Sequence, residues 1–201
     1  EIGAGVGQFQ VAARERTRWC VSGLEPGNEQ SALCRKLGLD VTQAFFQALP
    51  IDDASLDVVV SFHVLEHVDS PGEFIRHANR ILKPGGMLAL VLPDRAGTFD
   101  HRRPVTTLEH LVTDFENGTD ESDQTHVDEI LALHDYTMDP EAGGPEAFRA
   151  RALRNAENRG LHHHVFDAAL AGAMVEHAGF EVIATETLEP FHIFVIGRSA
   201  D

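Results

Sequence analysis

A continuous apolar run rich in β-branched residues, Leu-Asp-Val-Val-Val-Ser-Phe at positions 56–62, constrains the fold most. Such a run is typical of a parallel strand that is covered on both faces. A helix follows, beginning at Ser70-Pro71 with proline at its first position and ending at Lys83-Pro84-Gly85-Gly86, and a second apolar strand spans 87–92. A strand, a helix and a strand at this spacing form a right-handed crossover, which predicts an α/β fold with a mainly parallel sheet.

The same alternation continues on both sides of this unit. Before it, the pattern predicts helices over 9–16 and 28–37 and strands over 19–24 and 40–46. After residue 160, it predicts a helix over 167–178 and strands over 180–188 and 191–197. The last two strands are separated only by Glu189-Pro190, so we expect them to pair antiparallel.

The charge balance narrows the range of partners. Sixteen Lys and Arg stand against 32 Asp and Glu, a formal charge of −16 that repels nucleic acid and anionic membranes. No apolar run reaches the roughly 20 residues that span a bilayer, and no signal peptide is visible, so we expect a cytoplasmic protein without membrane insertion. Cys20 and Cys34 lie among apolar neighbours without the spacing of a zinc site, which predicts two buried thiols.

The first seven residues, Glu-Ile-Gly-Ala-Gly-Val-Gly, form a glycine-rich turn of the kind that joins a strand to a helix. Its glycines let a ligand approach the backbone, and the helix that follows offers free N–H groups to an anion. Glu25 ends the next predicted strand, where a carboxylate accepts both hydroxyls of a ribose. These features predict a nucleoside-containing cofactor, either a dinucleotide or S-adenosylmethionine. Because the turn needs a strand running into it, we expect the domain to be incomplete at its N-terminus.

Further segments carry a resemblance to a known family. They are residues 48–61, which include a Leu-Pro pair at 49–50, residues 64–68 with Leu-Glu-His, residues 80–86 with Lys-Pro-Gly-Gly, and residues 178–182. In order and spacing they resemble the class I S-adenosylmethionine-dependent methyltransferases, in the group that contains small-molecule methylases. The resemblance covers 1–94 and roughly 161–198. It implies a Rossmann-like, doubly wound sheet of seven strands with an antiparallel C-terminal hairpin.

The resemblance also implies a cofactor site for S-adenosyl-L-methionine. The methionine portion is expected at Gly3, Gly5 and Gly7, with Glu1 as the acidic residue of that motif. The ribose is expected at Glu25 and the adenine at Pro26. The family commonly has an acidic residue before the Leu-Pro pair, where this chain has Phe45, so we expect another kind of adenine contact, from Phe46 and Gln47. The remaining residues expected to face the cofactor are Phe62 and His63, although a core role for Phe62 stays open.

Methyl transfer requires alignment, exclusion of water and, for a protonated acceptor, a base. Histidine suits that role near neutral pH, and the catalytic candidates are His63, after the fourth strand of the fold, and His101, beyond the fifth. Arg102 and Arg103 beside it either hold an acidic substrate group or offset nearby acidic residues.

Two histidine groups invite a metal interpretation. His63, Glu66 and His67 share one face of a helical turn, as in related methyltransferases that bind a divalent ion, but those usually have Glu at the first position. We favour local hydrogen bonding there. The adjacent residues His162, His163 and His164 project in different directions. We therefore assign no residue to a metal.

The segment from about 95 to 160 departs from the alternating pattern. Between Glu109 and Glu146 it has many carboxylates and no Lys or Arg, and its apolar residues keep helical spacing. We expect a helical insertion, which either presents a solvated acidic face or closes over the acceptor as a lid.

These observations predict a single methyltransferase domain over 1–201 with that insertion. The expected activity is S-adenosylmethionine-dependent methyl transfer to a hydroxyl, carboxyl or amine of a small molecule or a glycan intermediate. One alternative is a non-catalytic module that acts in protein recognition through its acidic insertion. Another is a nicotinamide dehydrogenase, which leaves the Leu-Pro, Leu-Glu-His and Lys-Pro-Gly-Gly segments unexplained.

Overall fold

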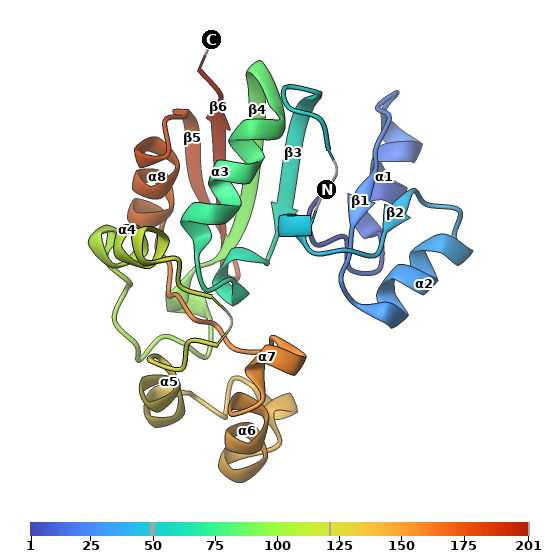
Figure 1. The fold of residues 1–201 in the computed structure, drawn as a ribbon. Helices are drawn as coiled ribbons and strands as arrows, with labels where there is room; N and C mark the ends of the chain where they lie inside the picture. The colour runs from blue at the N-terminus through green and yellow to red at the C-terminus, as the bar shows by residue number, and fades with distance from the viewer. Residues whose placement is uncertain (49–50, 121, 201) are drawn as a thin grey trace.

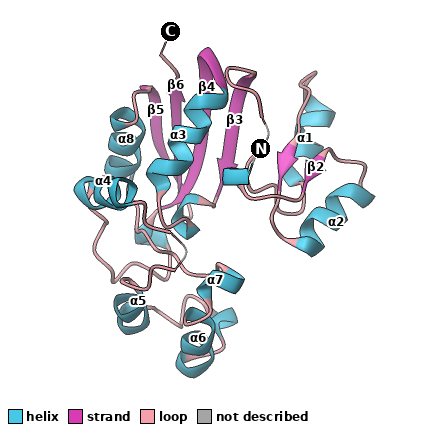
Figure 2. Ribbon diagram, viewed as in Figure 1, coloured by secondary structure: helices cyan, strands magenta, loops and turns pink. Residues whose placement is uncertain are grey.

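A computed structural model describes residues 1–48, 51–120 and 122–200, so the Leu-Pro pair at 49–50 lies outside the described residues. Six strands are described. Four of them form one part of the sheet in the order β3-β4-β6-β5, and two form a smaller part, β1-β2 (Figures 1 and 2). Their bounds are β1 Gly23–Leu24, β2 Val41–Thr42, β3 Leu56–Phe62, β4 Leu82–Pro93, β5 Glu181–Leu188 and β6 His192–Arg198.

The centre of the larger part is the parallel pair β3 and β4, as predicted. Val59 lies opposite Leu88, and both are buried. Helix α3, Pro71–Ile81, begins with proline in its first turn and covers this pair through Phe74 and Ile75, which are fully buried (Figure 1). The apolar faces of the strands and of this helix therefore form the main core.

The C-terminal hairpin closes one edge of the sheet. β5 and β6 pair antiparallel, and β6 also pairs antiparallel with β4, so the predicted hairpin is confirmed. Helix α8, Ala168–His177, packs against both hairpin strands. Its N-cap is Asp167, whose carboxylate accepts a hydrogen bond from the Leu170 amide at 2.8 Å.

Ile2 joins the two parts of the sheet. It forms single parallel bridges to Leu24 in β1 and to Ser61 in β3, and its amide donates to the Val60 carbonyl at 2.9 Å. The spatial order is therefore β2-β1-Ile2-β3-β4-β6-β5, flanked at the smaller part by α1, Gln8–Arg16, and α2, Asn28–Lys36 (Figure 1). The Rossmann-like α/β fold is present, with one residue at the central position where a seventh strand was predicted.

One prediction about the cysteines is wrong. Cys34 is buried, but Cys20 is exposed. The predicted strand over 19–24 is described as a strand only at Gly23–Leu24, where it meets β2, and Trp19 before it is 58% exposed. Cys20 therefore lies in the loop that precedes the sheet instead of within it.

The described part of the insertion contains helices joined by loops. It contains α4 Leu108–Asn117, α5 Val127–Leu133, α6 Pro145–Ala152 and α7 Asn155–Asn158. Phe148, Ile130 and Leu161 belong to a separate hydrophobic cluster between these segments. In Figure 1, α5, α6 and α7 lie beyond the carboxyl end of β3. No helix among the described residues is long and apolar enough to cross a membrane.

Arg103 anchors the start of the insertion. Its side chain is 1% exposed and donates to the Asp100 carboxylate at 3.0 Å, to Glu129 at 2.9 Å, and to the carbonyls of His162 and His163 at 2.7 and 3.0 Å. These bonds occupy the buried guanidinium with groups of the chain itself. Arg102 pairs with the buried Asp135, at 2.7 Å. Of the two roles considered for these arginines, the pairing with acidic residues of the insertion is the one observed.

Candidate functional site

The glycine turn adopts backbone conformations that favour glycine. Gly3, Gly5 and Gly7 have φ values of 76°, 53° and 82°. A Cβ at Gly3 would meet Val64 Cγ2 at 2.3 Å, so this glycine allows the turn to lie against the loop after β3. A Cβ at Gly5 would meet no atom of the chain within 4 Å. The backbone of Gly5 therefore faces open space, where a ligand can approach it.

A cleft of about 640 Å³ opens at this point. It brings together five of the residues predicted to contact the cofactor: Glu1, Gly3, Gly5, Phe62 and His63. Its walls are completed mainly by α1, β4 and β6, with Phe9 packed against Phe62 at 5.2 Å between ring centres. The cleft therefore lies at the carboxyl end of β3, where open α/β sheets bind ligands.

Glu1 contributes a carboxylate to this cleft. Its Oε2 atom is buried and has no hydrogen-bond partner among the described residues. Burial raises the pKa of the Glu1 carboxyl to about 7, because desolvation disfavours the charged form. A cationic group of a ligand would satisfy this atom and favour the ionised carboxylate.

Glu25 holds the glycine turn instead of lining the cleft. Its two carboxylate oxygens accept hydrogen bonds from the amides of Gly5 and Gly27, each at 2.7 Å. Each oxygen keeps a second lone pair, which is the one that a ribose hydroxyl requires. Gly7 packs beneath the turn, where a Cβ would meet Leu39 Cδ1 at 2.2 Å. Pro26 does not line the cleft.

The expected adenine contacts lie in a different hollow. Phe46 and Gln47 line a cavity of about 420 Å³ together with Asp69, Ser70 and residues of the insertion. Phe46 is buried in the 3-10 turn Phe46–Ala48 and packs edge-on against Phe74, with ring centres 5.1 Å apart. The structure therefore separates these two residues from the cleft at the glycine turn.

His63 occupies a strained position just after β3. Its φ is 52°, which is uncommon for a residue with a Cβ, and its amide donates to the Val91 carbonyl at 2.8 Å. The ring Nε2 lies 3.0 Å from Nδ1 of His192, and Nδ1 lies 3.6 Å from Glu66 Oε1. His63 therefore lies between a second histidine and a carboxylate.

The carboxylate is buried, and its neighbours favour the charged form. Burial by itself would raise the pKa of Glu66, but the nearby rings of His63, His67 and His162 hold it below the usual value. Burial and the neighbouring His63 lower the pKa of His192, which favours its neutral form. His192 also lines the cleft.

The residue that sequence reasoning missed here is His192. It begins β6, opposite Pro93 of β4, which brings it to the same edge of the sheet as His63. The antiparallel hairpin was the available signal, because it returns the chain to that edge. The second catalytic candidate, His101, lies elsewhere: its Nε2 is 3.1 Å from Asp135 in the insertion, and it does not line the cleft.

The three adjacent histidines diverge, as expected. His162 bonds to Asp100 at 2.6 Å, His163 pairs with Asp69 at 3.1 Å, and His164 turns towards α4. The ligand atoms of Glu66 and His67 come within 4.8 Å of His162. In the turn that the sequence suggested as a metal site, Glu66 and His67 are therefore grouped with His162, whereas His63 faces the cleft.

The arrangement of sheet, glycine turn and cleft defines a class of protein. A strand position followed by a glycine turn and helix, an acidic residue at the end of the next strand, and an antiparallel strand inserted beside β4 are the fold of the class I S-adenosylmethionine-dependent methyltransferases. Residues 1–90, a little less than half of the chain, match the family described as Methyltransferase domain, in agreement with this class. The cofactor of that class is S-adenosylmethionine.

Comparison with individual proteins agrees with this assignment. A probable S-adenosylmethionine-dependent methyltransferase of Mycobacterium tuberculosis is 42% identical over 57 residues, which are 28% of this chain and 21% of that protein. The chain thus matches about a fifth of the length of this relative. An uncharacterized protein of Methanocaldococcus jannaschii is 30% identical over 95 residues, 47% of this chain and 44% of its own.

Solved structures share the fold over nearly the whole chain. An S-adenosylmethionine-dependent methyltransferase from Mesorhizobium loti is similar with a TM-score of 0.62, at 17% identity, covering 98% of this chain and 88% of that one. A methyltransferase from Methanosarcina mazei has a TM-score of 0.56 at 19% identity and covers 99% and 90% of the two chains. These likenesses support the fold.

Proposed function

We propose that this chain transfers the methyl group of S-adenosylmethionine to a hydroxyl, carboxyl or amine of a small molecule or a glycan intermediate. The observation that carries the proposal is the cleft that unites Glu1, the glycine turn and His63 at the carboxyl end of β3. The formal charge of −16 supports an acceptor other than nucleic acid.

The residues of the cleft and the adjoining Glu25 fit the cofactor. The buried, unpartnered Oε2 of Glu1 suits the ammonium of a methionine, and the backbone of Gly5 leaves room beside it. The remaining lone pairs of Glu25 suit the ribose hydroxyls. When bound, S-adenosylmethionine supplies an electrophilic methyl carbon on a sulfonium centre.

In this proposal the pair His63 and His192 takes the proton of the acceptor. Their nitrogens lie 3.0 Å apart, so a proton accepted from a hydroxyl or an amine can be shared between the two rings. The charged Glu66 lies 3.6 Å from His63 and stabilises the positive charge that results. Phe9, Phe62 and Phe194 line the cleft and exclude water from the reaction.

Cofactor binding tests the first half of the proposal without knowledge of the acceptor. We expect S-adenosylmethionine and S-adenosylhomocysteine to raise the melting temperature and to bind saturably in calorimetry, and NADH to have no effect. Glu25→Ala should abolish binding, whereas the matched variant of the exposed Glu29 in α2, Glu29→Ala, should bind normally. The absence of binding to a folded wild-type chain would overturn the enzyme proposal.

Transfer to a panel of small-molecule acceptors tests the second half. In the presence of a working acceptor, His63→Asn should lower kcat by about 100-fold or more and change the Kd of the cofactor by much less, because a base acts on the acceptor. His177→Asn, at an exposed histidine of α8, is the control. Cofactor binding without transfer to any acceptor would favour the non-catalytic alternative.

A further inference from the structure

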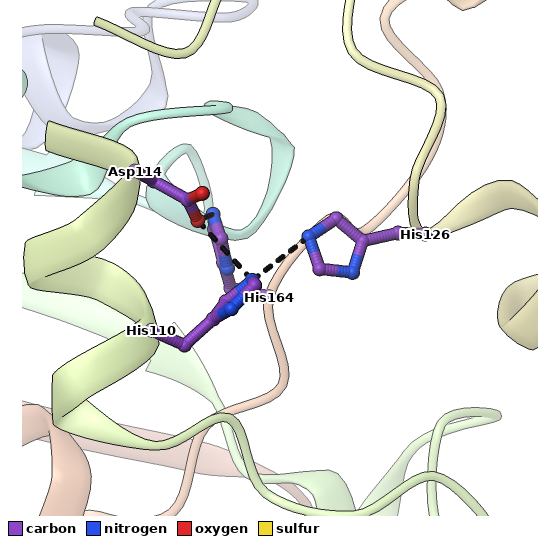
Figure 3. A group of neighbouring side chains, drawn as sticks. All are labelled: His110, Asp114, His126 and His164. Atoms are coloured by element: carbon purple, nitrogen blue, oxygen red, sulfur yellow. Dashed lines mark hydrogen bonds and ion pairs between the residues drawn. The ribbon is translucent and has the colours of Figure 1, made fainter. Parts of the chain in front are cut away.

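Four side chains far apart in the sequence meet outside the cleft. His110 and Asp114 lie one turn apart on α4, His126 immediately precedes α5, and His164 lies in the segment before α8 (Figure 3). One potential ligand atom from each residue lies within 4.8 Å of the corresponding atoms of the other three. Three imidazoles and one carboxylate therefore converge on a single point.

The spacing of these atoms matches a tetrahedral site. His110 Nε2 is 3.2 Å from His126 Nε2 and 3.2 Å from Asp114 Oδ2. Ligands that lie about 2.1 Å from a tetrahedral ion are about 3.4 Å from one another. The observed separations therefore need only small side-chain adjustments to surround one ion.

Two atoms of the cluster are left unsatisfied by the described residues. Asp114 Oδ2 and His164 Nδ1 are both buried and form no hydrogen bond there, and the partners of Asp114 Oδ2 are the histidines of the cluster itself. His164 Nε2 is 3.0 Å from the Asp69 carbonyl, so the Nε2–H can donate to that carbonyl. A histidine that donates from one nitrogen to a carbonyl presents the lone pair of the other, which is the usual arrangement of a metal ligand.

The carboxylate is oriented in the same way. Thr119 Oγ1 donates to Asp114 Oδ1 at 3.3 Å, which directs Oδ2 towards the histidines. The side chain of His164 is fully buried and that of Asp114 is 12% exposed, whereas the side chain of His110 is 40% exposed. The site is therefore closed on the side of the core and accessible from the side of α4.

We propose that His110, Asp114, His126 and His164 bind one Zn²⁺ ion. Three imidazole nitrogens and one carboxylate oxygen are a donor set that zinc accepts, and magnesium and calcium prefer oxygen ligands alone. Four protein ligands leave no position for a substrate, so the ion has a structural role. It joins α4 and the start of α5 to the segment that leads back into the sheet.

Metal analysis of the untagged 201-residue chain tests this proposal. After addition of zinc and dialysis, we expect one Zn²⁺ per chain, and Co²⁺ in its place should give the visible absorption of a four-coordinate ion. Asp114→Asn and His126→Asn should each weaken Zn²⁺ binding by at least about 100-fold in a chelator competition, more than the loss of a supporting hydrogen bond would.

Two controls keep the result specific. His177→Asn removes an exposed histidine and should retain full zinc binding. His67→Asn disrupts the other group of neighbouring ligands, Glu66, His67 and His162, and should also retain it. The proposal is overturned if the wild-type chain retains no zinc, if both cluster variants bind as the wild type does, or if only His67→Asn loses the ion. Circular dichroism identifies any variant that fails to fold. In that case the chelator competition with the wild-type chain still decides whether zinc binds.

Discussion

His63 shows how a single residue directs the candidate site. Its positive φ costs of the order of 1–3 kcal/mol for a residue with a Cβ, and the backbone hydrogen bond to Val91 holds it there. The strained backbone follows the last residue of β3 and precedes the turn that carries Glu66. The ring is thereby brought between Glu66 and His192, at the edge of the cleft.

Gly5 gives a prediction at the same scale. Gly5→Ala adds a methyl group that meets no atom of the chain within 4 Å, so it projects into open space at the cleft. We expect the Kd for S-adenosylmethionine to rise by about tenfold or more in calorimetry. The melting temperature should fall by only a few degrees, because an alanine at positive φ costs about 1–2 kcal/mol.

The control variant Gly38→Ala distinguishes the loss of space for the ligand from the effect of backbone strain. Gly38 follows the C-cap of α2 with a φ of 68°, and a Cβ there also meets nothing within 4 Å, but it lies outside the cleft. This variant should show the same loss of stability and normal cofactor affinity. Equal affinities of the two variants would contradict the assignment of the cleft.

At the scale of elements, a buried ion pair helps to hold together the two ends of the insertion. Arg103 and Asp100 follow β4, and Arg103 also bonds the carbonyls of His162 and His163 at the far end of the insertion. The two ends of the insertion are thus tied together by charged hydrogen bonds in a buried place, where a missing partner is costly.

Asp100→Asn should therefore destabilise the fold by about 3–5 kcal/mol at pH 7, measured by urea unfolding. Burial by itself would raise the pKa of Asp100, but His162 and Arg103 hold it below 3.8. Because the folded-state pKa is lowered, this stabilisation is present above pH 3.8 and is lost as the pH falls through the folded-state value. The difference in the free energy of unfolding between variant and wild type should therefore become smaller at acidic pH.

The control for this comparison is Asp57→Asn. Asp57 pairs with Lys83 at 2.7 Å, but its side chain is 82% exposed. An exposed pair contributes about 0–1 kcal/mol, so this variant should resemble the wild type at every pH. If Asp100→Asn lowered the free energy of unfolding as little as Asp57→Asn does, the buried pair would not be an anchor of the insertion.

Elements with a strong local pattern were predictable from the sequence. The bounds of β3 are those of its apolar run, and α3 begins at the predicted proline. The strand predicted over 19–24 is shorter, because pairing with β2 decides its length, and propensity alone does not report pairing. The meeting of His63 with His192, and of His164 with His110, joins residues across the chain, which no local pattern encodes.

At the scale of the molecule, the sheet has a seam. β1 and β2 are two residues long each, and among the described residues the only strand pairing that joins them to β3 is through the single bridges of Ile2. By contrast, β3, β4, β6 and β5 pair along most of their length. Few backbone hydrogen bonds cross this line, although Ile2 and Leu24 pack into the main core, so we expect local opening to begin here.

Amide hydrogen exchange measures this opening. Without ligand, the amides of Ile2 and Leu24 should exchange faster than those of β4, because they donate to the carbonyls of Val60 and Glu1 where the smaller part joins the rest of the sheet. S-adenosylmethionine at 100 times its Kd should slow them by up to about 100-fold, provided that opening releases the ligand. Equal slowing over the whole chain would show instead that only global unfolding exposes these amides.

The cleft lies across this seam, with the glycine turn on one side and Phe62, His63 and His192 on the other. A molecule bound there would contact both sides and would therefore hold together two parts of the sheet that few backbone hydrogen bonds join. Occupancy of the site and mechanical closure of the sheet are then the same event, and the empty protein opens first where its ligand enters.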